Sequence, residues 1–322
     1  MRENSYCLCC GKRIDTKSDK GWHTSCIRSF FGTDKMPDIS LNNEELNRIV
    51  TGTVAKKLTV TGVQKKLSLH LSGTKEKRLT LVDYPTGYIL KPQTDMYRHL
   101  PEFEALTMLM AERCGVKTVP NGLINIGDSY AYITKRIDRH ITDGVIEKYA
   151  MEDFCQLSDR LTEDKYKGSY EKCAKIIDDY SDTVGFDKTE FFLRLVFCFV
   201  TGNSDMHLKN FSLKEDNPGS QHYLLSEAYD LLPVNVVMPE DTEETALTLN
   251  GKKNRLKRED FLILAEKIDV PQKVASNIIE KVCSYKDEFI NMCKESLLDE
   301  EEKETYISLI YVRISRLKRT SE

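Results

Sequence analysis

Residues 201–213, T-G-N-S-D-M-H-L-K-N-F-S-L, constrain this chain more than any other stretch. They follow an apolar, helix-like run at residues 191–200 and bring together four polar side chains: Asp205, His207, Lys209 and Asn210. Further along, Asp230 stands among apolar neighbours in A-Y-D-L-L. Asp and Asn after a buried helix often serve only as caps and turns. The loop is therefore either a capping turn or part of a reactive site.

The interval between Asp205 and Asn210 helps to distinguish these two interpretations. It is five residues, as in the catalytic loop of protein kinases, where the Asp accepts the proton of the substrate hydroxyl and the Asn binds a metal ion. Asp230 then stands where a second metal ligand would belong. The interval favours phosphoryl transfer, although neither the Asp205–Asn210 loop nor the segment around Asp230 is decisive alone.

Length and charge exclude several classes of protein. At 322 residues the chain is long enough for one large domain or two. A formal net charge of -4 and a pI of about 6.0 provide no global basic field, so we expect no direct binding to nucleic acid. The N-terminus lacks the apolar core of a signal peptide, and the longest apolar run is broken by Arg194. We therefore expect a cytoplasmic protein without a membrane partner.

The cysteines are unevenly distributed. Six of the ten stand singly in helix-like contexts and are typical of buried thiols in a reducing compartment. The other four lie within the first 26 residues, where Cys7, Cys10, His23 and Cys26 form C-x2-C, a loop, then H-x2-C. Three thiolates and an imidazole suit a tetrahedral, structural Zn²⁺ site, and Cys9 could replace Cys10 in it. The alternative is a thiol-rich, disordered arm.

The expected elements change in kind along the chain. After a polar helix and linker at residues 34–58, we expect strands at residues 58–71, 79–82, 88–92, 123–126 and 130–135, with a helix at 102–114. From residue 151 onward the pattern is helical, at residues 152–161, 170–179, 191–200, 261–268, 274–298 and 301–319. This order predicts an α+β fold with two lobes, like that of protein kinases. A zinc-knuckle-like segment (residues 1–33) would precede a small antiparallel-sheet N-lobe (34–138) and a mainly helical C-lobe (139–322).

Other parts of a kinase-like site fall in a workable order. Lys91, at the end of an expected strand, would neutralise nucleotide phosphates, and Glu104 would orient it through a charge-assisted bond. The backbone of residues 134–137 would form a hinge that bonds to an adenine edge.

These motifs together resemble the HipA-like serine/threonine kinases, the toxins of bacterial toxin–antitoxin modules. The resemblance is carried by T-V-T-G-V-Q-K-K-L, Y-I-L-K-P, E-F-E-A-L-T-M-L-M-A-E-R-C-G-V, Y-I-T-K-R-I-D-R, M-E-D-F-C-Q, G-N-S-D-M-H-L-K-N-F-S and A-Y-D-L-L-P. The G-N-x-D-x-H-x-K-N-x-S loop is the most specific of them.

The resemblance implies ATP and Mg²⁺ as cofactors and phosphorylation of a protein hydroxyl. Asp205 would be the catalytic base, with His207 and Lys209 at the phosphate end, while Asn210 and Asp230 would bind Mg²⁺. The other nucleotide-binding residues would be Thr61, Gly62, Val63, Gln64, Lys65, Lys66, Lys91, Glu104, Lys135, Arg136, Ile137 and Tyr229. Lys135 departs from the family, in which this hinge position is usually acidic.

The resemblance also implies partners and regulation. Larger family members carry an N-terminal subdomain, and the cysteine knuckle stands in its place here, as in a short toxin whose subdomain is a separate small protein. A helix-turn-helix antitoxin would complete the module, and the substrate would be a translation component such as an aminoacyl-tRNA synthetase. Thr59 and Thr61, in the glycine turn, would be autophosphorylated. The plain alternative is that both are β-branched strand residues.

Two other functions stay open: a small-molecule or lipid kinase of the same fold, and a non-catalytic binding module that uses the knuckle. The retained Asp205, Asn210, Asp230 and Lys91 argue against the binding module, because buried like charges repel one another without a metal ion.

Overall fold

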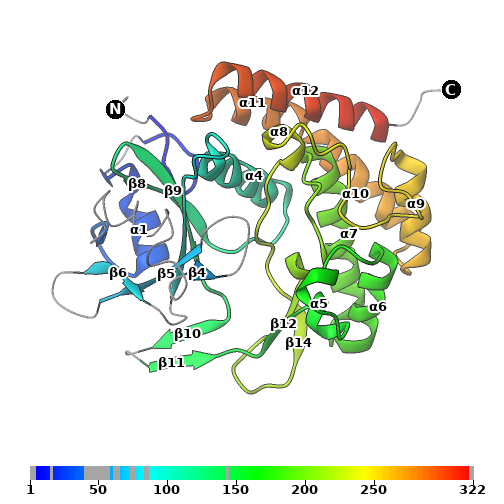
Figure 1. The fold of residues 1–322 in the computed structure, drawn as a ribbon, viewed down its shortest axis with the longest axis horizontal. Helices are drawn as coiled ribbons and strands as arrows, with labels where there is room; N and C mark the ends of the chain where they lie inside the picture. Colours follow the sequence, from blue (N-terminus) through cyan, green and yellow to red (C-terminus); the bar gives the residue numbers. More distant parts are fainter. Residues whose placement is uncertain are drawn as a thin grey trace. The chain divides into compact units, whose positions relative to one another are not determined.

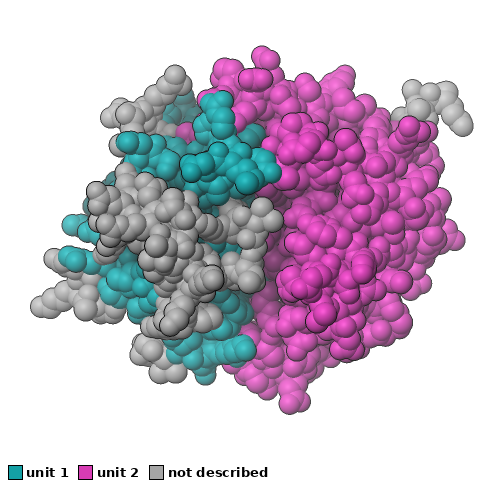
Figure 2. Space-filling model, in the orientation of Figure 1, with its two compact units in different colours: residues 1–105, 119–148 teal, residues 106–118, 149–322 magenta. Residues whose placement is uncertain are grey.

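The computed structural model describes residues 5–14, 17–39, 59–60, 66–72, 77–82, 87–142 and 145–318 (Figure 1). The chain divides into two compact units, residues 1–105 with 119–148 and residues 106–118 with 149–322 (Figure 2). Most of the expected polar helix and linker, residues 40–58, lies outside the described residues. So does the turn at residues 61–65, which includes Thr61.

The first unit is built on a seven-stranded sheet of order β3-β6-β5-β7-β9-β8, with β4 paired to β5. The strands are β3 (Asp38–Ile39), β4 (Thr59–Val60), β5 (Lys66–Leu71), β6 (Arg78–Val82), β7 (Tyr88–Pro92), β8 (Asn121–Ile126) and β9 (Ser129–Lys135). All neighbours are antiparallel except β3 and β6. Leu67, Leu69 and Leu90 in the central strands are fully buried, and Ser68 and Lys91 beside them are buried too, so burial in β5 and β7 does not follow strict alternation. Outside this sheet, β10 (Arg139–Thr142) and β11 (Val145–Lys148) form a hairpin that the sequence did not predict.

The cysteine-rich segment is folded and belongs to the first unit. It contains β1 (Ser18–Asp19), β2 (Trp22–His23) and α1 (Thr24–Phe31), which ends at Gly32 with a left-handed φ of 68°. The rings of Phe30 and Phe31 lie 5.6 and 5.4 Å from the ring of Tyr88 on β7. Through this contact the two phenylalanines dock the segment on the rest of the unit.

The second unit is mainly helical and also contains one small sheet. Its helices are α5 (Phe154–Leu157), α6 (Tyr170–Tyr180), α7 (Val184–Thr201), α8 (Val234–Val237), α9 (Arg258–Lys267), α10 (Gln272–Ser284), α11 (Lys286–Glu295) and α12 (Glu300–Leu317). Two short 3-10 turns, η1 (Thr162–Asp164) and η2 (Leu208–Asn210), complete it, with the end of α4 (Leu100–Cys114). The sheet joins β12 (Met151–Asp153), β13 (Ser212–Glu215) and β14 (Tyr223–Leu225), none of which was expected.

Helix α7 is the centre of the second unit. Every residue from 191 to 201 is buried, because the run is apolar on all sides apart from Arg194. The Arg194 guanidinium is satisfied by Glu190 Oε1 at 3.0 Å and the Ser226 carbonyl at 2.7 Å. Among the described residues, no helix is both long and apolar enough to cross a bilayer.

Two predicted helices are wrong. Residues 152–161 do not form one helix, because Met151–Asp153 pairs with β13 and the Asp153 side chain then caps α5, which ends before Ser158. Residues 274–298 form two helices, α10 and α11, which meet at Tyr285, followed by a turn to Asp299. Asp299 forms a capping box with Glu302 and so begins α12.

The glycine that ends α7 should be intolerant of a side chain. Gly202 has a φ of 72°, and an added Cβ would lie 2.9 Å from Leu309 Cδ2. We expect Gly202→Ala to lower the free energy of unfolding by about 1–3 kcal/mol in urea denaturation. Gly251→Ala is the control, because its φ is 76° but nothing lies within 4 Å of its added Cβ. Equal losses in the two variants would show that Leu309 moves aside without cost.

Candidate active site

The loop after α7 is fixed by hydrogen bonds at its start. The Asn203 N–H donates to the Cys198 carbonyl at 2.8 Å, and Asn203 Oδ1 accepts from the Asp205 N–H at 3.2 Å. Ser204 Oγ donates to Asp241 Oδ2 at 2.7 Å. These bonds leave the Asp205 carboxylate 45% exposed at the end of a buried helix. It is therefore accessible to a substrate while its backbone is held.

Two aromatic residues lie beside the Asp205 carboxylate. The Tyr166 hydroxyl donates to Oδ1 at 2.7 Å, and His207 Nε2 lies 3.9 Å from Oδ2, which is too far for a hydrogen bond. Sequence patterns did not point to Tyr166. It lies in a polar stretch 39 residues before Asp205, and no spacing rule connects the two positions.

His207 is buried and held in one tautomer. Its Nδ1 accepts the backbone N–H of Lys209 at 3.3 Å, so in the neutral ring the proton is assigned to Nε2. Burial lowers the pKa of His207 below its usual value, although the Asp205 carboxylate opposes this shift. A neutral imidazole with its Nε2–H facing Asp205 can donate a hydrogen bond but is a poor place to hold positive charge.

Lys209 and Asn210 point to different partners. Lys209 Nζ forms an ion pair with Asp153 Oδ2 at 2.7 Å, at the end of β12. Asn210 is buried, and its Nδ2 donates to the Asp205 carbonyl at 2.8 Å. That bond orients the side-chain amide, so that Oδ1 is the atom left to bind a cation.

The β13–β14 hairpin brings the second predicted metal ligand back to this loop. The Tyr229 hydroxyl bonds both Ser212 Oγ at 2.6 Å and the Lys209 carbonyl at 3.1 Å. Next to it, Asp230 has a left-handed φ of 56°, and its carboxylate acts electrostatically on His207. Non-glycine residues adopt this conformation rarely, and often at functional sites. The amide oxygen of Asn210 and the carboxylate of Asp230 are oxygen donors of the kind that Mg²⁺ prefers, so this donor set fits the ion.

The first unit contains the expected lysine–glutamate pair. Lys91 Nζ on β7 lies 2.5 Å from Glu104 Oε1 on α4, and the two side chains are only 4% and 2% exposed. The ammonium also lies 5.2 Å from the centre of the Tyr132 ring, a cation–π contact with the neighbouring strand. The pair is thus buried and oriented, as a phosphate-binding lysine requires.

The backbone of the predicted hinge is partly occupied. The Lys135 N–H donates to the Pro120 carbonyl at 3.0 Å and the Arg136 N–H to the Gly87 carbonyl at 2.8 Å. The Arg136 guanidinium binds both carboxylate oxygens of Asp138, at 2.8 and 2.6 Å. An adenine edge would therefore need the N–H of Ile137 or a carbonyl of this segment.

The expected nucleotide-covering residues are mostly not placed. Thr61, Gly62, Val63, Gln64 and Lys65 lie outside the described residues, and Lys66 is the first residue of β5. Thr59 begins β4 and is paired with Leu67.

The four predicted zinc ligands are brought together in the first unit. The ligand atoms of Cys7, Cys10, His23 and Cys26 all lie within 4.8 Å of one another. Cys9 is not among them, because its Sγ is directed at the Asn121 carbonyl, 3.7 Å away. This geometry favours Cys10 over Cys9 as the fourth ligand.

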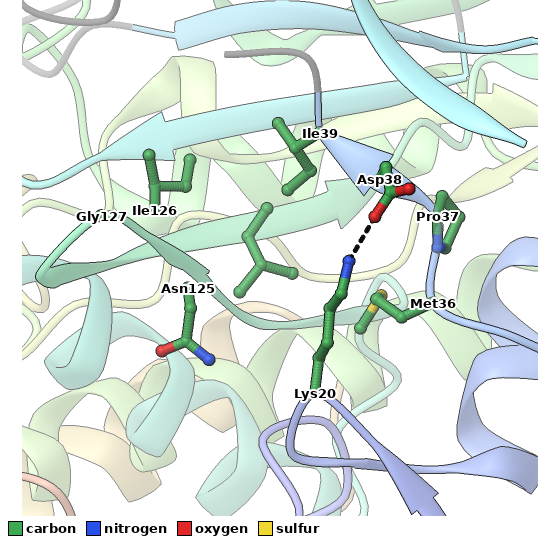
Figure 3. Close-up of a pocket in the computed structure, with 9 residues that line it drawn as sticks. Lys20, Met36, Pro37, Asp38, Ile39, Asn125, Ile126 and Gly127 are labelled. Carbon is green, nitrogen blue, oxygen red and sulfur yellow. Dashed lines mark hydrogen bonds and ion pairs between the residues drawn. The ribbon is translucent and has the colours of Figure 1, made fainter. Parts of the chain in front are cut away.

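A cavity of about 400 Å³ in the first unit is separate from all of these residues. Figure 3 shows it between the segment that carries Met36 and Asp38 and the strand that ends at Ile126; Lys20 and Asp38, which both line it, form an ion pair at 2.6 Å. Its lining includes no candidate catalytic or metal-binding residue named above.

The buried Lys91–Glu104 pair gives a test of stability. Glu104→Ala removes the carboxylate from a buried ammonium and should lower the free energy of unfolding by about 3–5 kcal/mol in urea. Lys91→Met/Glu104→Leu should recover most of that loss, because two apolar side chains carry no desolvation cost. Lys175→Met, which breaks an exposed pair with Asp179, is the control and should cost less than about 1 kcal/mol. A double variant as unstable as Glu104→Ala would contradict this account.

Comparison with known proteins identifies a family. The family described as the HipA-like C-terminal domain matches residues 58–288. The "Putative kinase Y4dM" of Sinorhizobium fredii is 30% identical over 68% of this chain and 56% of its own length. The serine/threonine-protein kinase toxin HipA of Shewanella oneidensis is 27% identical over 58% of this chain and 45% of its own length. The chain thus spans about half the length of the curated relatives it matches.

A solved structure shows the same fold. A chain from the complex of Shewanella oneidensis HipA, HipB and operator DNA superposes with a TM-score of 0.69 and 18% identity, covering 86% of this chain and 70% of that one. The predicted α+β, protein-kinase-like fold is confirmed by this likeness. Because the family match covers most of the chain, the protein belongs to the HipA-like C-terminal domain family.

Proposed function

We propose that this protein is an ATP- and Mg²⁺-dependent serine/threonine protein kinase. The observation that carries the proposal is the bond from Asn210 Nδ2 to the Asp205 carbonyl, 2.8 Å long. It joins an exposed carboxylate and a buried amide in one rigid loop, five residues apart, next to Asp230. Such a loop places a proton acceptor and a metal-binding oxygen together, which phosphoryl transfer to a hydroxyl requires.

Each residue has a role in this proposal. Asp205 accepts the proton of the substrate hydroxyl, and Asn210 and Asp230 hold Mg²⁺. When bound, Mg²⁺ supplies positive charge that neutralises the phosphate oxygens. Lys91, oriented by Glu104, offers its ammonium to the phosphates, and Tyr229 fixes the chain that carries Asp230. His207 and Lys209 line the phosphate end, and neutral His207 also stiffens the loop, since its Nδ1 accepts the Lys209 N–H.

Further nucleotide contacts and a second metal ion are part of the proposal. Residues 61–66 cover the nucleotide, and Lys135, Arg136 and Ile137 flank the adenine. A zinc ion bound by Cys7, Cys10, His23 and Cys26 is structural, because four protein ligands leave no open position for a catalytic water.

The biological setting is proposed from the relatives. One of them is named a kinase toxin, and the similar solved structure is that of a complex with HipB and operator DNA. By this likeness the chain is a toxin held by a helix-turn-helix antitoxin, with a small protein in place of the N-terminal subdomain. Its substrate is then a translation component such as an aminoacyl-tRNA synthetase.

Autophosphorylation of Thr59 and Thr61 is proposed as a means of self-inactivation. Each phosphate would add a charge of about -1.5 to -2 beside the bound triphosphate. Like-charge repulsion would displace the turn from the nucleotide and slow further turnover.

Radiolabelled ATP and a lysate provide the test. We expect Asp205→Asn to lower phosphate transfer by about 10²–10⁴-fold with an unchanged melting curve, because the amide cannot accept a proton. Asp230→Asn should be partly rescued by excess Mg²⁺. Asp287→Asn, at a side chain that is 86% exposed on α11, is the control and should behave as wild type.

The location of the label separates the alternatives. Label in one protein band supports a protein kinase, and label only in small molecules or lipids indicates the other kinase class. Phosphosite mapping by mass spectrometry should find phosphate at Thr59 or Thr61 in the wild type and none in Asp205→Asn. Full activity of folded Asp205→Asn would refute the assignment of Asp205 as the base. Absence of any phosphate transfer by the wild type would support the alternative function, a non-catalytic binding module.

A further inference from the structure

Two of the three cysteines in the cluster lie at distances from His23 that suit a tetrahedral zinc site. Cys10 Sγ and Cys26 Sγ lie 3.4 and 3.9 Å from His23 Nδ1. With Zn–S of about 2.3 Å and Zn–N of about 2.0–2.1 Å, tetrahedral geometry requires S···N separations of about 3.5 Å. His23 Nε2 lies 3.1 Å from the Arg13 carbonyl, to which it donates when Nδ1 is the ligand. The cluster therefore has both the ligand spacing and the outer hydrogen bond of a metal site.

The cysteine-rich segment covers the edge of the sheet at strand β8. Strand β8 is the last strand in the order, so within the described part of the chain one side of it has no strand partner in the sheet. The Leu123 N–H on this side donates to the Leu8 carbonyl at 2.9 Å, and the Leu123 carbonyl accepts from Trp22 Nε1 at 2.7 Å. Leu8 lies between Cys7 and Cys9, and Trp22 precedes His23. The groups that cap β8 are therefore direct neighbours of the metal-site residues.

Trp22 fits its place on β8 only because residue 122 is glycine. An added Cβ on Gly122 would lie 2.5 Å from Trp22 Cζ2. Trp22 is fully buried, and its ring lies 5.3 Å from Phe30 and 5.6 Å from Phe31. These two rings in turn contact Tyr88, on the strand that carries Lys91. One packed aromatic cluster thus runs from the metal site to the strand of the phosphate-binding lysine.

We propose that zinc at Cys7, Cys10, His23 and Cys26 clamps Leu8 and Trp22 onto the edge of β8. Without the ion, the thiols and the imidazole link the two short chain segments only by weak sulfur hydrogen bonds, Cys10 Sγ to His23 Nδ1 and the His23 N–H to Cys7 Sγ, both 3.4 Å long. The segments also have few residues with which to form a core. Loss of zinc then exposes both the β8 edge and the aromatic cluster. The first unit then needs bound zinc to stay folded, whether or not the protein catalyses phosphoryl transfer.

The protein offers a direct optical test, because Trp22 is its only tryptophan. We expect about one zinc ion per chain in protein purified without a His-tag. Removal of zinc by a chelator should shift the tryptophan emission to the red and lower the Tm, and added zinc should reverse both changes. Emission that stays that of a buried indole after zinc removal would overturn the clamp.

Variants separate the metal from the packing. Cys26→Ser should lose zinc and shift the emission, whereas Cys9→Ser, the neighbouring thiol, should retain both. Gly122→Val should displace Trp22 and shift the emission while zinc stays bound. Loss of zinc from Cys9→Ser, or full zinc in Cys26→Ser, would overturn the ligand assignment. If Cys26→Ser does not fold, chelation of the wild type still decides the outcome.

A second, independent observation concerns Tyr166. Its hydroxyl donates to Asp205 Oδ1, and its ring packs edge-on against His207 with 4.9 Å between centroids. Although Tyr166 is 46% exposed, partial desolvation of its hydroxyl, followed by the hydrogen bond and charge of Asp205, raises the pKa of Tyr166. The phenol therefore keeps its proton at neutral pH and acts as the donor. The other charged groups that face it are Lys165, 4.9 Å from the ring centre, and Asp241.

We infer that Tyr166 is a positioning residue that holds the Asp205 carboxylate in place by one oxygen. The second oxygen then stays in a fixed direction for the substrate hydroxyl. This inference rests on the proposed phosphotransfer function. An alternative role, in which Tyr166 blocks Asp205 until substrate displaces it, predicts the opposite effect of removing the hydroxyl.

Tyr166→Phe retains the ring on His207 and removes only the donor. We expect kcat to fall roughly tenfold with KM for ATP unchanged, because a hydrogen bond to a charged group is lost from the reacting residue. Tyr180→Phe, at a half-exposed phenol on α6, is the matched control and should leave both constants unchanged. An unchanged kcat would overturn the positioning role, and a raised kcat would show that Tyr166 blocks Asp205.

A second readout does not depend on activity. The difference in ultraviolet titration between wild type and Tyr166→Phe isolates this one phenol, and Asp205→Asn should move its ionisation to lower pH. If the wild type transfers no phosphate, the proposed function fails, but this titration still decides whether Tyr166 and Asp205 are bonded. An ionisation that Asp205→Asn leaves in place would overturn the contact itself.

Discussion

The burial of helix α7 is the constraint on which the second unit depends. The apolar part of this helix, residues 191–201, is buried on all sides, and α6, α10, α12 and β14 contact the helix. The polar side chains of the candidate site can then lie only beyond the end of α7. Gly202 makes that ending abrupt with its left-handed φ, and the next eight residues contain the candidate base and the candidate metal ligand. The loop starts directly at the end of a buried helix and is hydrogen-bonded to it, so the packed core holds the start of the loop in place.

The first unit meets a different requirement, which is to keep buried a charged pair formed between strand β7 and helix α4. Lys91 and Glu104 are stable there because each neutralises the other at 2.5 Å and because the sheet around them is closed to water. An open edge at β8 would weaken that closure. The cysteine segment covers the edge, and its aromatic rings reach Tyr88 on the same strand as Lys91. The cysteine segment that covers the β8 edge thus also packs against the strand that carries the buried Lys91.

Sequence patterns predicted the parts of the site better than the elements around them. The pairing of Lys91 with Glu104 and the clustering of Cys7, Cys10, His23 and Cys26 were expected and are present in the structure. The strand at Met151–Asp153 was mistaken for helix, because a three-residue strand has no periodicity and forms only by pairing with β13. The break between α10 and α11 was missed, because both helices continue the same apolar pattern through Tyr285.

Local residue patterns were enough to indicate the family, the order of the parts and the local chemistry. These predictions relied on short sequence spacings, such as the five residues from Asp205 to Asn210 or the three from His23 to Cys26. The contacts between distant groups became known only from the folded chain: Tyr166 with Asp205, Lys209 with Asp153, and Trp22 with Leu123. It also separated Cys9 from Cys10, since adjacent side chains differ in direction rather than in type. Contacts across long sequence separations depend on how the whole chain packs, and no local pattern of residues encodes them.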